Sequence, residues 1–299
     1  MKKLKTINVW GVWLVIALLN LGCGEEGGLK GTLKISITDA PVDADQVKSV
    51  NLVITNIEGY QNGNWKAFRN FEQPVGVNLL AYTGGKSILL IDQYTSPGEF
   101  SSMKLSLNMA NRNSSLIISP QSNIVFKNGS SAPLYMPEGQ APEVVLEKGM
   151  GIYSRGITDI TLDFDLRKSI RINEKGEYIL DPYVRFVETK KSGHIKAALV
   201  NSAVPNRVVV YAYKRGTFSG NEATQTGDRV AFFNSTTSTY ISAKQFSLGF
   251  LEEGVYDLIF VKHLETGVTM EVLGRYNEVK VSADEIISID VDLSQLSPS

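Results

Sequence analysis

Short segments of alternating hydrophobic and polar residues run along most of the chain. In the first of them, residues 32–41, three aliphatic side chains alternate with polar ones before Asp39 and Pro41. Successive side chains of a strand point to opposite faces of a sheet, so this period of two predicts a half-buried strand. The strand should end there, because Asp bonds to its own local backbone and Pro has no N–H to donate.

The same alternation predicts strands throughout both halves of the chain. Those of the first half are expected at residues 47–57, 87–91, 103–109, 124–126, 144–146, 160–167 and 178–186. After a polar break at 190–193, further strands are expected at 195–199, 208–213, 246–250, 254–258 and 287–293. Asn62 and Gly63 suit the positive φ angles of a tight hairpin. The one weak helical pattern lies within residues 147–159. We therefore predict an all-β protein with two β-sandwich domains in tandem, at residues 31–189 and 193–299.

Composition narrows the class of protein. The chain has 299 residues, of which 43% are hydrophobic and 20% charged, which is typical of a globular protein and too apolar for disorder. Without residues 1–22, 27 basic residues stand against 31 acidic ones, a net charge of −4. A mildly acidic chain offers nucleic acid no electrostatic attraction, so we expect no nucleic-acid partner.

Residues 1–22 have the pattern of a signal peptide. Lys2, Lys3 and Lys5 precede an apolar run at residues 9–19 that is too short for a comfortable membrane span. Residues 20–23, Asn-Leu-Gly-Cys, resemble a bacterial lipobox, in which the cysteine is acylated and becomes the new N-terminus. Asn20 departs from that pattern, where an aliphatic residue is usual. The alternative is an uncleaved N-terminal anchor with Cys23 as a buried thiol.

Cys23 is the only cysteine of the chain. An exported protein with a single cysteine at the end of its leader has no disulfide to form, so the residue is expected to serve as the anchor. The lipobox resemblance implies a lipid bilayer as partner, reached through acylated Cys23, for example by palmitate. Residues 23–30 then form an acidic, glycine-rich tether.

The first residues of the tether suggest an address. Gly24 rather than Asp follows the cysteine, which in lipoproteins argues against retention in the inner membrane. Glu25 and Glu26 resemble the export signal of Bacteroidetes-type lipoproteins. We expect an outer-membrane lipoprotein exposed at the cell surface, with a periplasm-facing orientation as the alternative.

Asp163 and Asp165 are the strongest candidates for chemistry. Together with Arg167 they alternate with apolar residues, which places them on one face of the predicted strand, about 7 Å apart. Two carboxylates could serve a carbohydrate-active enzyme or contact a cation. Alternatively, basic residues on neighbouring strands, such as Lys168 or Arg185, pair with them and fix the register of the sheet.

Other residues could contact a ligand. Asp39, Asp43 and Asp45 share one turn and could bind calcium, but their spacing matches no EF-hand loop, and turn capping explains them equally well. Trp65, on the predicted hairpin, is either an aromatic platform for a sugar or for another protein's side chain, or a residue packed into the core.

Nothing in the sequence predicts a catalytic residue, a metal or a cofactor. His194 and His263 are too few for a zinc site without a cysteine. There is no G-x-S-x-G elbow for a serine nucleophile and no glycine-rich phosphate loop.

Several motifs carry a resemblance to known families. In residues 31–188, TDAPVDAD, the Trp65 hairpin, NLLAYTGG, PGEFSSMKLSL, LDFDLRKSI and YILDPYVRF resemble the DUF4382 family, which occurs in bacterial lipoproteins and has no assigned function. Asn78 departs from it, where an acidic residue is expected. In residues 193–299, GHIKAALV, VVVYAY and FSLGFLEEGVYDLIFV are similar to transthyretin-like (carboxypeptidase-regulatory-like) sandwiches.

These resemblances imply an exported, β-rich protein and no reaction. We therefore predict a membrane-anchored envelope lipoprotein that acts as a binding or structural module without catalysis. Its partner would be a polysaccharide or another envelope protein. The alternatives are a carbohydrate-active enzyme or accessory subunit that uses Asp163 and Asp165, and a plain structural spacer.

Overall fold

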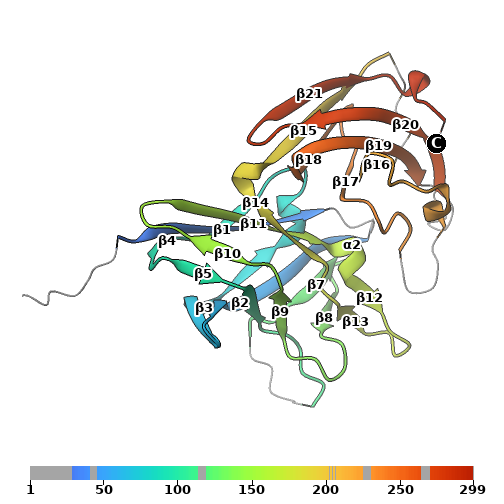
Figure 1. Cartoon of the computed structure of the whole chain (residues 1–299). Coiled ribbons are helices and arrows are strands. Elements are labelled where there is room, and N and C mark those ends of the chain that lie inside the picture. Colours follow the sequence, from blue (N-terminus) through green and yellow to red (C-terminus); the bar gives the residue numbers. More distant parts are fainter. Residues whose placement is uncertain are drawn as a thin grey trace, which may run out of the picture.

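The computed structural model describes residues 29–40, 46–113, 119–201, 203, 205, 207–224, 230–263 and 270–298. The described chain is nearly all β, with a few short helical turns, which confirms the predicted fold class (Figure 1). We call residues 29–188 the N-terminal half and residues 192–298 the C-terminal half.

The N-terminal half is a sandwich of two main sheets. Its elements are β1 (Gly31–Ala40), β2 (Val47–Gln61), β3 (Asn64–Asn78), η3 (Leu79–Tyr82), β4 (Ile88–Thr95), β5 (Gly98–Phe100), β6 (Ser102–Leu107), β7 (Asn123–Phe126), β8 (Ser131–Tyr135), β9 (Glu143–Leu146), β10 (Met150–Ile152), β11 (Ile157–Asp165), α2 (Leu166–Ser169), β12 (Ile170–Ile172), β13 (Tyr178–Leu180) and β14 (Val184–Glu188). One sheet has the order β14-β11-β1-β4, with β1 parallel to β11. The other has the order β12-β13-β8-β7-β2-β6-β9, with β3 beside β2. The short strands β5 and β10 pair with each other.

The core of this half lies between the two sheets. Alternate residues of β1 and β11 face it, among them Ile35 and Leu162, and they meet residues of β2 and β6 such as Ile54 and Leu105, all fully buried. Burial of these aliphatic side chains is the main stabilising contribution of the sandwich.

The C-terminal half is a smaller sandwich. Its elements are β15 (Ser192–Leu199), β16 (Val208–Lys214), η5 (Gly220–Ala223), β17 (Thr237–Tyr240), β18 (Gln245–Glu252), β19 (Gly254–His263), β20 (Met270–Val281), β21 (Ile286–Val291) and η6 (Leu293–Gln295). The sheets β18-β15-β21 and β17-β16-β19-β20 enclose one core. A second cluster, which includes Tyr211 and Phe232, covers the outer face of β16 and β19, so these two strands are buried on both faces.

Some local predictions are confirmed and others are wrong. Asn62 and Gly63 form the β2–β3 turn with φ angles of 52° and 80°, as expected. The helical pattern within residues 147–159 forms no helix and contains β10 and the start of β11. The predicted strand 178–186 is interrupted between β13 and β14 around Pro182, which has no N–H for a ladder.

The two halves are joined by a single 3-10 turn, η4 (Thr189–Lys191). Among the described residues, no sheet pairs a strand of one half with a strand of the other. In Figure 1 the C-terminal half lies against β14 and α2 of the N-terminal half. The division into two domains at the polar break of residues 190–193 stays a prediction. Side-chain hydrogen bonds connect the two halves.

Candidate functional site

Asp163 lies on β11 directly opposite Arg185 of β14. The Arg185 guanidinium donates a hydrogen bond from Nη2 to Asp163 Oδ2. Its Nη1 donates to the backbone oxygen of Phe250, in the C-terminal half, at 3.2 Å. The Asp163 side chain is only 5% exposed. The sequence alternative in which Arg185 pairs with this carboxylate is therefore what the structure shows, and the same guanidinium also reaches the other half.

Asp165 ends β11 and begins α2. Its side chain accepts a hydrogen bond from the Lys168 backbone N at 3.2 Å, the geometry of a helix N-cap. Lys168 Nζ lies 3.0 Å from Asp165 Oδ2 and donates to the backbone oxygen of Ser235 at 2.7 Å, with no exposed side-chain area. Because the cap starts a helix, Arg167 leaves the strand, and our expectation that it shares a strand face with the two carboxylates is wrong.

Arg167 makes several contacts with the C-terminal half. Its guanidinium donates to the backbone oxygens of Ala231 and Phe232, the latter at 3.1 Å, and to Ser235 Oγ at 3.1 Å. It also lies 5.2 Å from the centre of the Tyr211 ring. Arg167, Lys168 and Arg185, with their acceptors in the C-terminal half, form a set that we call the interdomain clamp.

Asp39 lies beside this clamp and is 4% exposed. Its Oδ1 accepts a hydrogen bond from Leu166 N at 3.3 Å, whereas its Oδ2 has no hydrogen-bond partner among the described residues. Burial raises the pKa of Asp39 well above its usual value, and the neighbouring Asp163 and Asp165 raise it further. Asp39 is therefore the member of this cluster that the structure favours in the neutral form.

Burial also shifts the pKa values of the charged members. It raises the pKa of Asp163, although the Arg185 charge opposes the shift. It lowers the pKa of Lys168, and here Asp165 opposes the shift. The carboxylates of Asp163 and Asp165 thus face cations of the protein itself.

Whether Asp39, Asp163 or Asp165 contacts a ligand stays a prediction, and Cys23, Asp43 and Asp45 lie outside the described residues.

Trp65 lies on the outer face of the larger sheet and is partly exposed. Its ring centre is 5.1 Å from that of Tyr60, and Lys104 Nζ lies 4.6 Å above the ring. Lys104 is held there by Glu58 at 2.9 Å and Glu143 at 3.4 Å. A hydrogen bond with Glu58 is the main cause that raises the pKa of Lys104. Trp65 therefore lies outside the core, and an ammonium group already covers one face of its ring.

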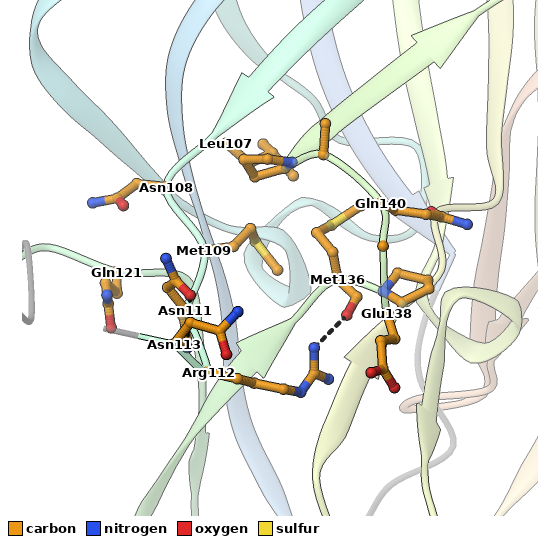
Figure 2. A pocket seen from close by; sticks show the side chains of 15 residues that line it. Leu107, Asn108, Met109, Asn111, Arg112, Asn113, Gln121, Met136, Glu138 and Gln140 are labelled. Carbon is orange, nitrogen blue, oxygen red and sulfur yellow. Dashed lines mark hydrogen bonds between the residues drawn. The ribbon is translucent and has the colours of Figure 1, made fainter. Parts of the chain in front are cut away.

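A pocket of about 700 Å³ lies in the N-terminal half and shares no lining residue with the clamp. Segments 107–113 and 136–142 form its two sides (Figure 2). Figure 2 shows Asn111, Asn113 and Gln121 on one side, Glu138 and Gln140 on the other, and Met109 and Met136 between them. We call it the amide-lined pocket. This pocket was not predicted, although the run Asn108–Asn113, written NMANRN, carries three amide side chains within six residues.

Arg112 connects the two sides of this pocket. Its Nη1 donates to the backbone oxygen of Met136 at 3.1 Å, and its Nε donates to Glu177 Oε2 at 3.1 Å. The guanidinium also lies 4.6 Å from the centre of the Tyr135 ring. These contacts hold the Arg112 side chain across the pocket and balance its charge.

No group of three His, Cys, Asp or Glu side chains among the described residues is placed to hold a metal ion. In the same residues, no helix is long and apolar enough to cross a membrane.

The fold and these contacts define an all-β protein built from two sandwiches and locked by buried ion pairs. Residues 30–182 match the family described as "Domain of unknown function (DUF4382)", and the chain belongs to this family. The resemblance of the N-terminal half to this family is thereby confirmed. No curated protein matches the chain.

Several solved structures are distantly similar. The Bacillus anthracis TIE protein is 11% identical over 88% of this chain and 34% of its own, with a TM-score of 0.19. This chain therefore spans about one third of that protein. The minor pilin GBS52 of Streptococcus agalactiae is 7% identical over 87% of this chain and 94% of its own, with a TM-score of 0.19. The fimbrial anchor protein Mfa2 of Porphyromonas gingivalis is 10% identical over 82% of each chain, with a TM-score of 0.20. Likenesses this slight carry no argument about function.

Proposed function

We propose that the protein is a lipid-anchored module of the bacterial cell envelope that binds or displays and does not catalyse. The observation that carries the non-catalytic role is the burial of the Asp163 and Asp165 carboxylates beside basic side chains. A general acid or base must reach a bound substrate. These two carboxylates are instead buried against Arg185 and Lys168, which at the same time bind backbone oxygens of the C-terminal half. Their placement supports a structural role.

The N-terminal sequence supplies the anchor in this proposal. A signal peptide of residues 1–22 is removed, Cys23 is acylated, and residues 23–30 act as a tether to the outer membrane. Several acyl chains on one residue suffice for stable attachment, whereas one chain would be marginal. The C-terminal half acts as a transthyretin-like spacer, and the clamp holds it in a fixed orientation to the family domain. The partner at the cell surface is a polysaccharide or another envelope protein.

Protease treatment of intact cells tests this location. Cells that express the wild-type chain or the Cys23→Ala variant are treated with protease, fractionated and probed for the protein. Surface display predicts loss of the wild-type protein from unbroken cells and release of the variant from the membrane fraction. Protection until lysis would show a periplasm-facing protein. A variant that stays in the membrane as firmly as the wild type would contradict the lipid anchor.

A further inference from the structure

We infer that the amide-lined pocket is a binding site for a neutral saccharide. This inference rests on the proposed function as a binding module and specifies its ligand. The pocket volume of about 700 Å³ lies within the range of roughly 300–1,000 Å³ that is usual for small-molecule sites. It could therefore accept a short part of a sugar chain.

Hydrogen bonds within the protein fix the two sides of the pocket relative to each other. Leu107 N donates to Pro142 O at 2.8 Å and ties the two sides together at one end. Ala110 N donates to Leu134 O at 3.1 Å and fixes the middle of the Asn-rich side. The Arg112 guanidinium makes the third link, to the backbone of Met136. A site that needs no rearrangement loses little entropy when a ligand binds.

The polar groups of the pocket match the hydroxyl groups of a sugar. A side-chain amide has an oxygen that accepts and an NH₂ group that donates, and each hydroxyl can do both. Asn111 Oδ1 accepts a hydrogen bond from Asn113 N at 2.8 Å, which fixes this side chain and leaves its NH₂ group for a ligand. Asn113, Gln121 and Gln140 provide further amides around the pocket.

The floor of the pocket is apolar. Met109 and Met136 are only 7% and 5% exposed, and their side chains lie between the two amide-bearing sides (Figure 2). Thioether side chains adapt to irregular apolar shapes. They can therefore pack against the C–H groups on the face of a sugar ring while the amides bind hydroxyls at its edge.

The charges of the pocket favour a neutral ligand. Among the described residues that line it, Arg112 and Glu138 are the charged ones. The Arg112 charge is already paired with Glu177. An acidic polysaccharide would find no uncompensated cation here, and a basic ligand would have Glu138 alone as an attraction.

A glycan array tests the inference. The full-length protein, purified in detergent, is applied to neutral gluco-, xylo-, manno- and galacto-oligosaccharides, to oligogalacturonate as the acidic comparison, and to unrelated peptides. The affinity for the best neutral oligosaccharide is then measured by calorimetry. Asn111→Ala and Asn113→Ala each remove an amide that can hydrogen-bond a sugar hydroxyl, so together they should weaken binding at least tenfold.

Two further variants are controls for position. Gln295→Ala removes an exposed amide from the C-terminal half and should bind like the wild type. Trp65→Ala removes a partly exposed aromatic ring from β3, outside the pocket, and should also leave binding unchanged. Asn111 and Asn113 are both exposed, so a circular dichroism melt should show that the double variant is folded.

Three results would overturn the inference. They are the absence of binding to every neutral oligosaccharide, stronger binding to oligogalacturonate or peptides, and binding that survives in the folded double variant. None of them affects the proposed envelope anchor, because protease treatment of intact cells reports the location of the protein whether or not it binds a sugar. Loss of the anchor, in turn, would leave the result of the array unchanged.

Discussion

The Asp163–Arg185 pair offers the sharpest test of the clamp. The Arg185→Leu substitution leaves the Asp163 carboxylate, 5% exposed, without its cation. Removal of one partner from a buried ion pair costs about 3–5 kcal/mol of the free energy of unfolding, because the remaining charge is uncompensated. Because the Arg185 side chain is 18% exposed, we expect the loss of unfolding free energy at pH 7 to lie near the lower end of this range, at about 3 kcal/mol.

The double variant Asp163→Asn/Arg185→Leu separates the charge effect from lost packing. It strands no charge, so it should be at least about 1 kcal/mol more stable than Arg185→Leu. Equilibrium unfolding in urea, followed by far-ultraviolet circular dichroism, measures both values, and urea is preferred because it does not screen ion pairs. Lys190→Met is the matched control, because the Lys190–Asp284 pair ties the joining turn η4 to the C-terminal half but is 69% and 63% exposed. It should cost less than about 1 kcal/mol.

The prediction for Arg185 also has a pH dependence. Without the guanidinium, burial alone acts on Asp163 and raises its folded-state pKa further above the unfolded value. The cost of Arg185→Leu should therefore shrink as the pH falls and the carboxyl becomes neutral. The reasoning is refuted if Arg185→Leu costs less than about 1 kcal/mol at pH 7, or if the double variant is no more stable than the single one.

Two further substitutions test the same region. The folded-state pKa of Asp39 is raised above its unfolded value, so its stabilising contribution is present below the unfolded pKa and is lost as the pH rises through the folded pKa. Asp39→Asn, which mimics the neutral carboxyl, should be more stable than the wild type at pH 8, with a difference that vanishes toward about pH 4 in urea unfolding; an equal difference at both pH values would contradict it. A Cβ on Gly249 would lie 2.4 Å from Gly85 Cα of the other half and 2.9 Å from His194 Nδ1. Gly249→Ala should therefore lower stability by about 1–3 kcal/mol in a thermal melt, while Gly76→Ala, with open space at its Cβ, should change little.

Local sequence patterns predicted the elements whose cause is local. The β2–β3 turn follows from the positive φ angles of Asn62 and Gly63, and β1 follows from strict alternation. The long strand β20 was not predicted, because Gly274 and Glu278, with φ angles of 146° and 61°, interrupt the alternation of its side chains. Register shifts in the β19–β20 ladder have the same effect.

The candidate site was only partly predictable because its contacts are distant in sequence. Alternation placed Asp163 and Asp165 on one strand face, but it could not tell whether Arg185 or a ligand would meet them. The contacts of Arg167 and Lys168 with residues 231–235 join segments more than 60 residues apart and leave no local pattern. The burial of Asp39 was missed for a similar reason, since an Asp before Ala-Pro is typical of an exposed turn.

The position of β1 has a mechanical consequence. β1 is the first described strand after the proposed tether, and it is inserted between β11 and β4. Ladder hydrogen bonds run across the strands, so a pull on residue 29 along β1 loads the bonds to both neighbours in shear and at the same time. They would have to rupture together, whereas a strand peeled from the edge of a sheet opens one bond after another. A domain attached to the membrane in this way would resist traction on whatever it holds.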